Sequence, residues 1–519
     1  MIEWRMLRFC IRRLPLAAGT ALVLLAAGPS LAAGLPPAQH AVFAAPQPQS
    51  SPVTTYHNDP YRSGQYVAEN VTLKSARRMH LERSFKGVVN GAVYAQPLYW
   101  RARNETGAGE VIVATETNHV TALDAATGAV IWDRVLAPPV QGGTLPCGNI
   151  APEGVTGTPA IDAASGSLYV AATALANGRR AVSLVYGLSL KTGHVLAGWP
   201  VNVGASLARV HFLPEAQGER GALAFTNGEL YVPYGGRYGD CDDYHGTVVG
   251  IRTANPGVNA EWHTDAVRGG IWSVGGVAIA DGNLFAVTGN TSGASTWSGG
   301  EAIVRLSPAL KMIGGAQSYF APSDWEDLDN SDEDLGGSNA LPVDTGGRKL
   351  IVALGKDGNA YLADRLNLGG VGGQLAQTRA STGEIIGGAA SWAASGAAFV
   401  AFQGNGAARK CGGNNGLTVL RVTGGAKPSI GTAWCAGLNG GGDPVVTTSD
   451  GRSDRIVWAV GAEGDDRLHG YSAQNGAAVY DGGTANDQMQ NVRHMSTILV
   501  AHGRFYIASD NRLYAFALR

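Results

Sequence analysis

The stretch "EVIVATETNHVTALDAATGAVIWD" (Glu110–Asp133) carries the pattern on which the fold of this chain depends. An apolar run, a turn, a second run "HVTALDA", a Thr-Gly turn and a third run ending on Trp132 follow one another without a break. Short runs of this kind, bounded by turn residues, are typical of β-strands. The stretch therefore predicts successive strands joined by tight turns.

Variants of the second half of this stretch recur to the end of the chain, and the last copy is truncated. These copies are Val185–Pro200, Val248–His263, Ala302–Ala316, Ala360–Gln374, Leu417–Trp434, Leu468–Gly483 and Asn511–Arg519. A spacing of roughly 45 to 65 residues suits four-stranded blades with loops of variable length. With the first stretch there are eight copies, which predict an all-β fold, an eight-bladed β-propeller of four-stranded blades over residues 53–519.

The ends of the repeat region suggest how the ring closes. The final copy, "NRLYAFALR", has room for a single strand, so "RMHLERSFKG" (Arg78–Gly87) is expected to supply other strands of the closing blade. Closure leaves no sheet edge open to solvent. Four tryptophans at the ends of copies are expected to pack between neighbouring sheets: Trp132, Trp199, Trp262 and Trp434.

Composition excludes several classes of protein. The chain has 519 residues, of which 74 are glycine, 15% are charged and 45% are hydrophobic, which fits many short strands and tight turns. Its formal net charge is -2. Such a balance gives no electrostatic reason to expect a nucleic acid or an acidic membrane surface as partner.

The N-terminus reads as an export signal. A basic stretch, a short apolar run and small residues up to Ala32 predict a signal peptide over residues 1–32, followed by an Ala/Pro-rich linker over 33–52. The apolar run is too short for a membrane span, so we expect a periplasmic or secreted protein with no span in the mature chain.

Cysteine usage agrees with an oxidising compartment. Removal of the signal takes Cys10 and leaves an even number of cysteines. The most plausible pairs are Cys411 with Cys435 and Cys147 with Cys241, although four cysteines allow three connectivities.

Several local motifs together resemble the quinoprotein alcohol dehydrogenase family, eight-bladed propellers with tryptophan-docking repeats that carry pyrroloquinoline quinone (PQQ). Besides "ALDAATGAVIW", they are "GGIWSVGGVAIADGNLFAVTGN" (Gly269–Asn290), "YFAPSDWEDLD" (Tyr319–Asp329) and "LIVALGKDGNAYLADR" (Leu350–Arg365). They occur in family order. The resemblance implies a PQQ- and calcium-dependent dehydrogenase that oxidises an alcohol or a sugar.

The resemblance also implies roles for individual residues. Trp272 would be the surface on which the flat quinone stacks, and Asn290 would be a calcium ligand. Asp327 would be the general base and a metal neighbour, with Asp329 close by, and Lys356 would contact the quinone oxygens. Trp272, Asn290, Asp327 and Lys356 are therefore expected to converge near the propeller axis.

Each of these residues also has a structural interpretation. Trp272 could pack between blades, Asn290 could occupy a left-handed turn, Lys356 could sit in a hairpin turn, and Asp327 lies in an acidic run typical of a solvated loop. Taken in order along the chain, the four residues favour the quinoprotein interpretation.

The chain departs from the family pattern at several points. Where the family has two adjacent cysteines, this chain has only Cys147, and the segment "YGGRYGDCDDYHG" lacks the family's calcium glutamate, so Asp240, Asp242 or Asp243 would have to replace it. There is no Cys-x-x-Cys-His motif, so no haem is expected and electrons would pass to a separate acceptor such as a soluble cytochrome. The alternative function is a cofactor-free propeller that acts as a binding or envelope-assembly platform.

Overall fold

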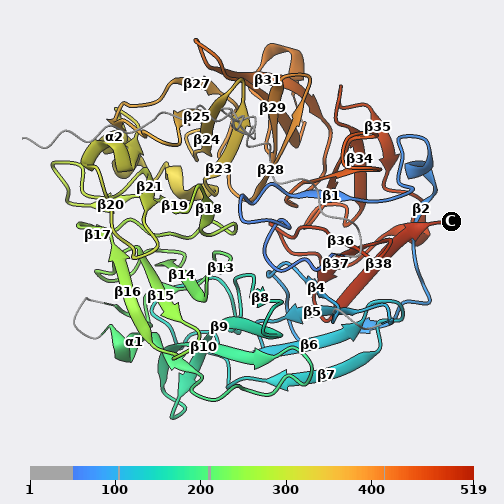
Figure 1. Cartoon of the computed structure of the whole chain (residues 1–519), viewed down its shortest axis with the longest axis horizontal. Coiled ribbons are helices and arrows are strands. Elements are labelled where there is room, and N and C mark those ends of the chain that lie inside the picture. Colours follow the sequence, from blue (N-terminus) through green and yellow to red (C-terminus); the bar gives the residue numbers. More distant parts are fainter. Residues whose placement is uncertain (1–50, 103–105, 208–211, 414) are drawn as a thin grey trace, which may run out of the picture. The chain divides into compact units, whose positions relative to one another are not determined.

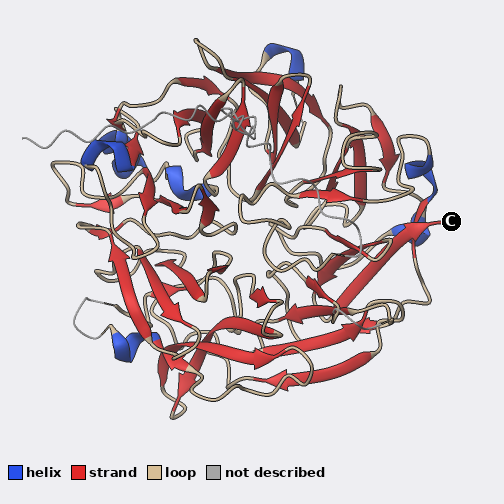
Figure 2. Ribbon diagram, viewed as in Figure 1, coloured by secondary structure: helices blue, strands red, loops and turns tan. Residues whose placement is uncertain are grey.

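The structure is a computed structural model that describes residues 51–102, 106–207, 212–413 and 415–519. Eight β-sheets of four or five strands are arranged as blades around a common centre (Figure 1), which confirms the predicted eight-bladed propeller. Figure 2 shows how little helix accompanies the strands. The predicted signal peptide, residues 1–32, and residues 33–50 of the predicted linker lie outside the described residues.

In the first four blades, consecutive strands pair antiparallel and the first strand lies nearest the centre. Blade 1 contains β4 (Leu98–Trp100), β5 (Glu110–Ala114), β6 (His119–Asp124) and β7 (Val130–Val135). Blade 2 contains β8 (Ala160–Asp162), β9 (Ser167–Ala176), β10 (Arg180–Ser189) and β11 (Val201–Asn202). Blade 3 contains β13 (Ala224–Thr226), β14 (Glu229–Gly236), β15 (Thr247–Arg252) and β16 (Val258–His263). Blade 4 contains β18 (Ala278–Ala280), β19 (Asn283–Thr288), β21 (Ala302–Leu306) and β22 (Tyr319–Ala321).

The next three blades repeat this arrangement. Blade 5 contains β23 (Leu341–Thr345), β24 (Arg348–Leu354), β25 (Asn359–Asp364) and β27 (Ala376–Arg379). Blade 6 contains β28 (Ala389–Ala394), β29 (Ala397–Gln403), β30 (Leu417–Thr423) and β31 (Ser429–Ala436). Blade 7 contains β32 (Val445–Thr448), β33 (Ile456–Val460), β34 (Leu468–Ser472) and β35 (Ala478–Asp481).

Blade 8 joins the two ends of the propeller. Its first three strands are β36 (Leu499–Ala501), β37 (Arg504–Ser509) and β38 (Arg512–Leu518), and its fourth is β2 (Met79–Leu81), antiparallel to β38. The contribution of the N-terminal segment is thus confirmed. The final copy of the repeat contains β38 alone, as expected, because each copy covers the third and fourth strands of a blade and β2 takes the fourth place here.

Short strands and helices lie between the blades or at their edges. The additional strands are β1 (Gln65–Val67), β3 (Gly87–Val88), β12 (Gln217–Gly218), β17 (Val267–Arg268), β20 (Thr291–Ser292) and β26 (Gly370–Val371). The α-helices of the described residues are α1 (Val203–Ser206) and α2 (Trp325–Ser331). The 3-10 helices are η1 (Ser75–Arg78), η2 (Gly315–Ser318), η3 (Leu335–Gly337), η4 (Arg409–Cys411) and η5 (Ala485–Asp487). None of the helices in the described part of the chain has the length and apolar character needed to cross a membrane.

The tryptophans that end the repeats join one blade to the next. Trp434 donates its indole N–H to the Ala473 carbonyl at 3.0 Å, and a Cβ added to Gly476 would lie 2.6 Å from its ring. Trp132 packs in the same way over Gly193 of the following blade. The glycine of each turn therefore makes room for the preceding tryptophan. As predicted, all four tryptophans lie in apolar clusters shared by two blades: Trp132, Trp199, Trp262 and Trp434.

The segment over residues 53–68 crosses the centre of the ring and ties distant blades together. The Tyr56 hydroxyl donates to Asp443, before blade 7, at 2.8 Å. The buried Arg62 guanidinium donates to the carbonyl of Val277, before blade 4, at 2.8 Å. This segment therefore restrains the inner edges of several blades at once.

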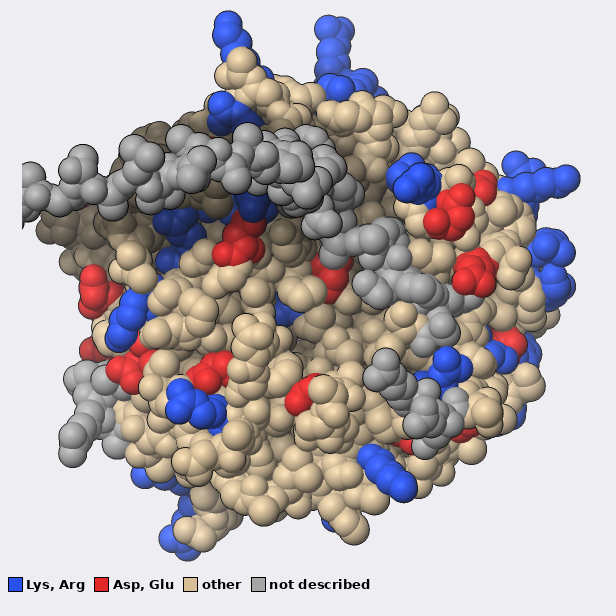
Figure 3. Space-filling view, viewed as in Figure 1, with Lys and Arg blue, Asp and Glu red and all other residues tan. Residues whose placement is uncertain are grey.

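Both predicted disulfides are present. Cys411 is bonded to Cys435, and Cys147 is bonded to Cys241 across a sequence separation of 94 residues. The second bond links the loop before blade 2 to a loop of blade 3. On the face shown in Figure 3, basic and acidic side chains are interspersed rather than gathered in a block of one sign.

Candidate functional site

Loops from several blades enclose a cavity of about 740 Å³. Its wall includes Asp240, Trp272, Asn290, Asp334 and Lys356, from segments that are far apart in the sequence. A volume of this order accommodates a small organic ligand, and the wall combines an aromatic face with charged groups of both signs.

Close backbone packing around the pairs Gly269-Gly270 and Gly235-Gly236 explains why Trp272 lies beside Asn290. The Gly269 N–H donates to the Asn290 carbonyl at 2.7 Å, and the Gly289 N–H donates to the Gly270 carbonyl at 2.9 Å. A Cβ on Gly270 would lie 3.1 Å from the backbone nitrogen of Gly236, so the glycines permit close backbone packing. The Gly-Gly-x-Trp segment is thereby held against the Thr-Gly-Asn turn.

Asp334 is the buried carboxylate at the centre of this arrangement. Its Oδ1 accepts from the Asn290 backbone N–H at 2.7 Å. A Cβ on Gly289 would overlap that same oxygen, so the glycine of Thr-Gly-Asn makes room for the carboxylate. Asp334 is only 3% exposed. The glycine and the asparagine of this turn therefore serve the placement of Asp334.

Lys356 approaches the same carboxylate from blade 5. Its Nζ donates to Asp334 Oδ2 at 2.7 Å and to Asp332 Oδ1 at 3.0 Å, and lies 6.0 Å from the centre of the Trp272 ring. Burial lowers the pKa of Lys356, but the two aspartates outweigh burial and raise the pKa above its usual value. The side chain is therefore a fixed cation beside the indole.

Further carboxyl groups lie close to Asp334. Burial, together with the charge of Asp334, raises the pKa of Asp240, of Asp329 and of the fully buried Glu301 above their usual values, although hydrogen bonds oppose the shift. Asp329 accepts from the Thr291 backbone N–H at 2.7 Å. Carboxyl groups thus outnumber the cations Lys356 and Arg268 at this end of the cavity.

The sequence-predicted residues fall into two groups. The structure brings Trp272, Asn290, Lys356, Asp329 and Asp240 to one cavity. Three other predicted residues are exposed and do not line it: Asp327, Asp242 and Asp243.

The expectation that Asp327 would join the convergent group is corrected by the structure. Asp327 lies in α2, whose buried side chains are Trp325 and Leu328, so it faces solvent. The carboxylate that meets Asn290 and Lys356 is Asp334, seven residues later in the same acidic run. Its position directly before Leu-Gly-Gly and the following strand is the signal that could have singled it out.

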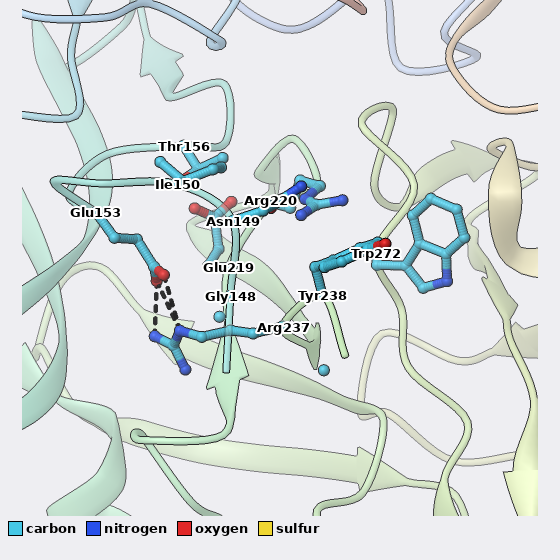
Figure 4. A pocket seen from close by; sticks show the side chains of 12 residues that line it. Gly148, Asn149, Ile150, Glu153, Thr156, Glu219, Arg220, Arg237, Tyr238 and Trp272 are labelled. Carbon is cyan, nitrogen blue, oxygen red and sulfur yellow. Dashed lines mark hydrogen bonds and ion pairs between the residues drawn. The ribbon is translucent and has the colours of Figure 1, made fainter. Parts of the chain in front are cut away.

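A smaller pocket adjoins the cavity on the side of blades 2 and 3 (Figure 4). It contains a buried ion pair in which Arg237 Nη2 lies 2.7 Å from Glu153 Oε1. Trp272 and Arg220 border both this pocket and the large cavity. The pocket therefore extends the cavity toward a second charged region.

The residues present suit a flat ligand and an oxygen-coordinated cation. The indole of Trp272 is partly exposed in the cavity, and Lys356 lies next to it. Within the described ranges, no group of three or more His, Cys, Asp or Glu side chains is arranged as metal ligands. The side-chain oxygens that line this end of the cavity include those of Asn290, Asp240 and Asp334, and both Asp334 oxygens accept hydrogen bonds, from the Asn290 N–H and from Lys356. These are hard oxygen donors of the kind that calcium prefers.

Comparison with known proteins identifies relatives in structure. No protein-family model matches the chain, and no curated protein matches it in sequence. The structure resembles a quinohemoprotein alcohol dehydrogenase from Comamonas testosteroni, with a TM-score of 0.62 and 16% identity over 90% of this chain and 80% of that one. It also resembles a europium-containing methanol dehydrogenase, with a TM-score of 0.59 and 13% identity over 90% of this chain and 98% of that one. The chain shares the eight-bladed propeller fold of these proteins.

A second quinohemoprotein alcohol dehydrogenase, from Pseudomonas putida, shares this propeller fold at a TM-score of 0.61 and 12% identity, over 90% of this chain and 80% of that one. On the same fold, the present chain joins Cys147 to Cys241. The disulfide anchors the loops that carry Asn149 and Asp240, both of which line the cavity. It therefore restrains part of the cavity wall.

Proposed function

We propose that the chain is a PQQ-dependent dehydrogenase that oxidises a small alcohol or a sugar in the periplasm or outside the cell. One observation carries the proposal: Trp272, Asn290, Asp334 and Lys356 meet in one cavity of a propeller with the quinoprotein fold. The acidic end of that cavity would supply oxygen donors for a calcium ion.

Each residue has a role that follows from its contacts. Trp272 would bind the flat cofactor by stacking, at little cost in entropy. Asn290, Asp334 and Asp240 would hold calcium through oxygen atoms. When bound, the quinone would supply the electron acceptor that alcohol oxidation requires. Asp334 would receive the hydroxyl proton of the substrate at its carboxylate, and Lys356 would keep that carboxylate in place. Electrons would leave through a separate acceptor, without haem in this chain.

The test compares two aspartates of the same acidic run. Purified protein is supplied with calcium and PQQ, and binding is followed by tryptophan fluorescence while dye-linked oxidation is measured on a panel of alcohols and sugars. Asp334→Asn is expected to lower turnover by about 100-fold or more, the usual contribution of a general base. Asp327→Asn, the matched exposed control, is expected to retain turnover within about twofold.

The alternative remains a cofactor-free binding platform. The proposal fails if PQQ with calcium neither binds to the wild-type protein nor supports turnover. It also fails in its assignment of the base if the two variants lose activity equally.

A further inference from the structure

Arg220 is a cation without a protein partner at the edge of the cavity. It lies between β12 and β13 and borders the large cavity, the pocket of Figure 4 and a third pocket that reaches Tyr56 and His494. Among the described residues, no hydrogen bond or ion pair involves its guanidinium. An arginine keeps its charge at physiological pH and offers five N–H donors in a planar fork. Arg220 therefore has unused capacity to bind a ligand.

Arg237, which borders the same pocket, has a protein partner for its charge and so differs from Arg220. Arg237 is bound to Glu153 and donates to the Pro214 carbonyl at 2.9 Å, so its charge is compensated. In the view of Figure 4, Arg220 extends away from this ion pair, toward the side on which Trp272 lies. The two guanidinium groups thus have different surroundings although they border the same pocket.

Glu153 and Glu116 favour the charge of Arg220 electrostatically, but among the described residues neither forms an ion pair with it. Glu116 and Glu219 are buried, and each accepts a backbone N–H, from Gly154 and from Gly157. Burial raises the pKa of Glu116 to about 8 and that of Glu219 well above its usual value. Glu116 therefore holds a proton at neutral pH. The third glutamate of this region, Glu153, is already paired.

We propose that Arg220 binds a carboxylate of the ligand that occupies the cavity. Trp272 borders both the pocket of Arg220 and the cavity of Asp334, so a flat ligand on its ring can extend toward both charged regions. The carboxylate belongs either to the quinone cofactor, which carries several, or to an acidic substrate. The first source rests on the proposed function. The second does not.

Binding measurements distinguish these sources. PQQ is titrated in the presence of calcium into the wild type, Arg220→Gln and Arg180→Gln, with quenching of tryptophan fluorescence as the readout. Arg180 does not line the cavity and pairs with Glu215 on the surface, so its loss is the control for removal of one positive charge. Loss of a charge-assisted, bidentate contact is expected to weaken binding to Arg220→Gln by about 10- to 100-fold. Arg180→Gln should change it by less than about threefold, and the trimethyl ester of PQQ should bind to wild type and Arg220→Gln alike.

A second arm uses small mono- and dicarboxylates without the quinone, with the shift in thermal unfolding temperature as readout. If PQQ does not bind to the wild type, the proposed function fails, but stabilisation by a carboxylate that is lost in Arg220→Gln still supports this proposal. If PQQ binds equally to wild type and Arg220→Gln, and no carboxylate distinguishes them, the proposal is overturned while the proposed function stands. The proposal is also overturned if neither protein binds PQQ or any carboxylate. Should Arg220→Gln not fold, Arg220→Lys is used, which keeps the charge and loses the bidentate fork.

Discussion

The raised pKa of the buried Glu116 predicts how the stability of the protein changes with pH. The residue follows β5, has no exposed surface, and its Oε2 accepts from the Gly154 N–H at 2.7 Å. Burial, only partly opposed by that hydrogen bond, raises its pKa from 4.5 to about 8. Between these two values the folded state holds a proton that the unfolded state has released. The free energy of unfolding must therefore decrease as the pH rises through this range.

The magnitude follows from the two pKa values. Each pH unit above the unfolded value costs about 1.4 kcal/mol, so the penalty reaches about 3 kcal/mol at pH 7 and about 5 kcal/mol near pH 8. Glutamine is neutral at every pH and its oxygen can still accept from Gly154. Glu116→Gln is therefore expected to be nearly as stable as the wild type near pH 5 and more stable by several kcal/mol near pH 8.

The measurement is urea unfolding of both proteins at these two pH values, followed by tryptophan fluorescence. Glu215→Gln is the control, because Glu215 forms a surface ion pair with Arg180 and should show no gain that grows with pH. The reasoning is refuted if Glu116→Gln changes stability by the same amount at both pH values, or if it destabilises the protein near pH 8.

Two further predictions concern contacts between neighbouring blades. Gly476→Ala should lower the free energy of unfolding by about 1–3 kcal/mol more than Gly178→Ala, because both glycines have positive φ but only Gly476 lies against Trp434. Equal losses of stability in urea unfolding would contradict this contact. Replacing Cys147 and Cys241 together by serine should lower the free energy of unfolding by about 2–5 kcal/mol, since the disulfide closes a long loop. A reductant should then lower the stability of the wild type far more than that of the variant. A variant as stable as the oxidised wild type would contradict a stabilising role.

The fold could be predicted from the sequence because a propeller is built from local units. Each copy, such as the one ending on Trp132, carries its own strands, its Thr-Gly turn and its docking tryptophan, and contacts mainly the next blade. The disulfide between Cys411 and Cys435 is local in the same sense. Such features depend on residues that are close together in the sequence, so they can be predicted from one sequence alone.

Some residues of the candidate site could be predicted from local motifs, whereas others depend on packing. Trp272, Asn290 and Lys356 stand in short motifs that resemble those of a known family, and the structure places all three at one cavity. The sequence does not distinguish Asp334 from Asp327, because Asp327 faces solvent only once Trp325 and Leu328 of α2 pack inward, and Asp334 lies beyond the end of that helix.

The charged region around Arg220 could not be inferred from sequence at all. Glu116 and Glu219 come from different blades, and their protonation depends on burial that exists only once the ring has closed. Whether an arginine is paired, like Arg237, or free to bind a ligand is decided by which groups the closed ring places within reach. The repeating blade and its turns follow from local sequence, whereas the charges of the cavity arise only in the folded ring, because electrostatic interactions depend on distance and burial rather than on order along the chain.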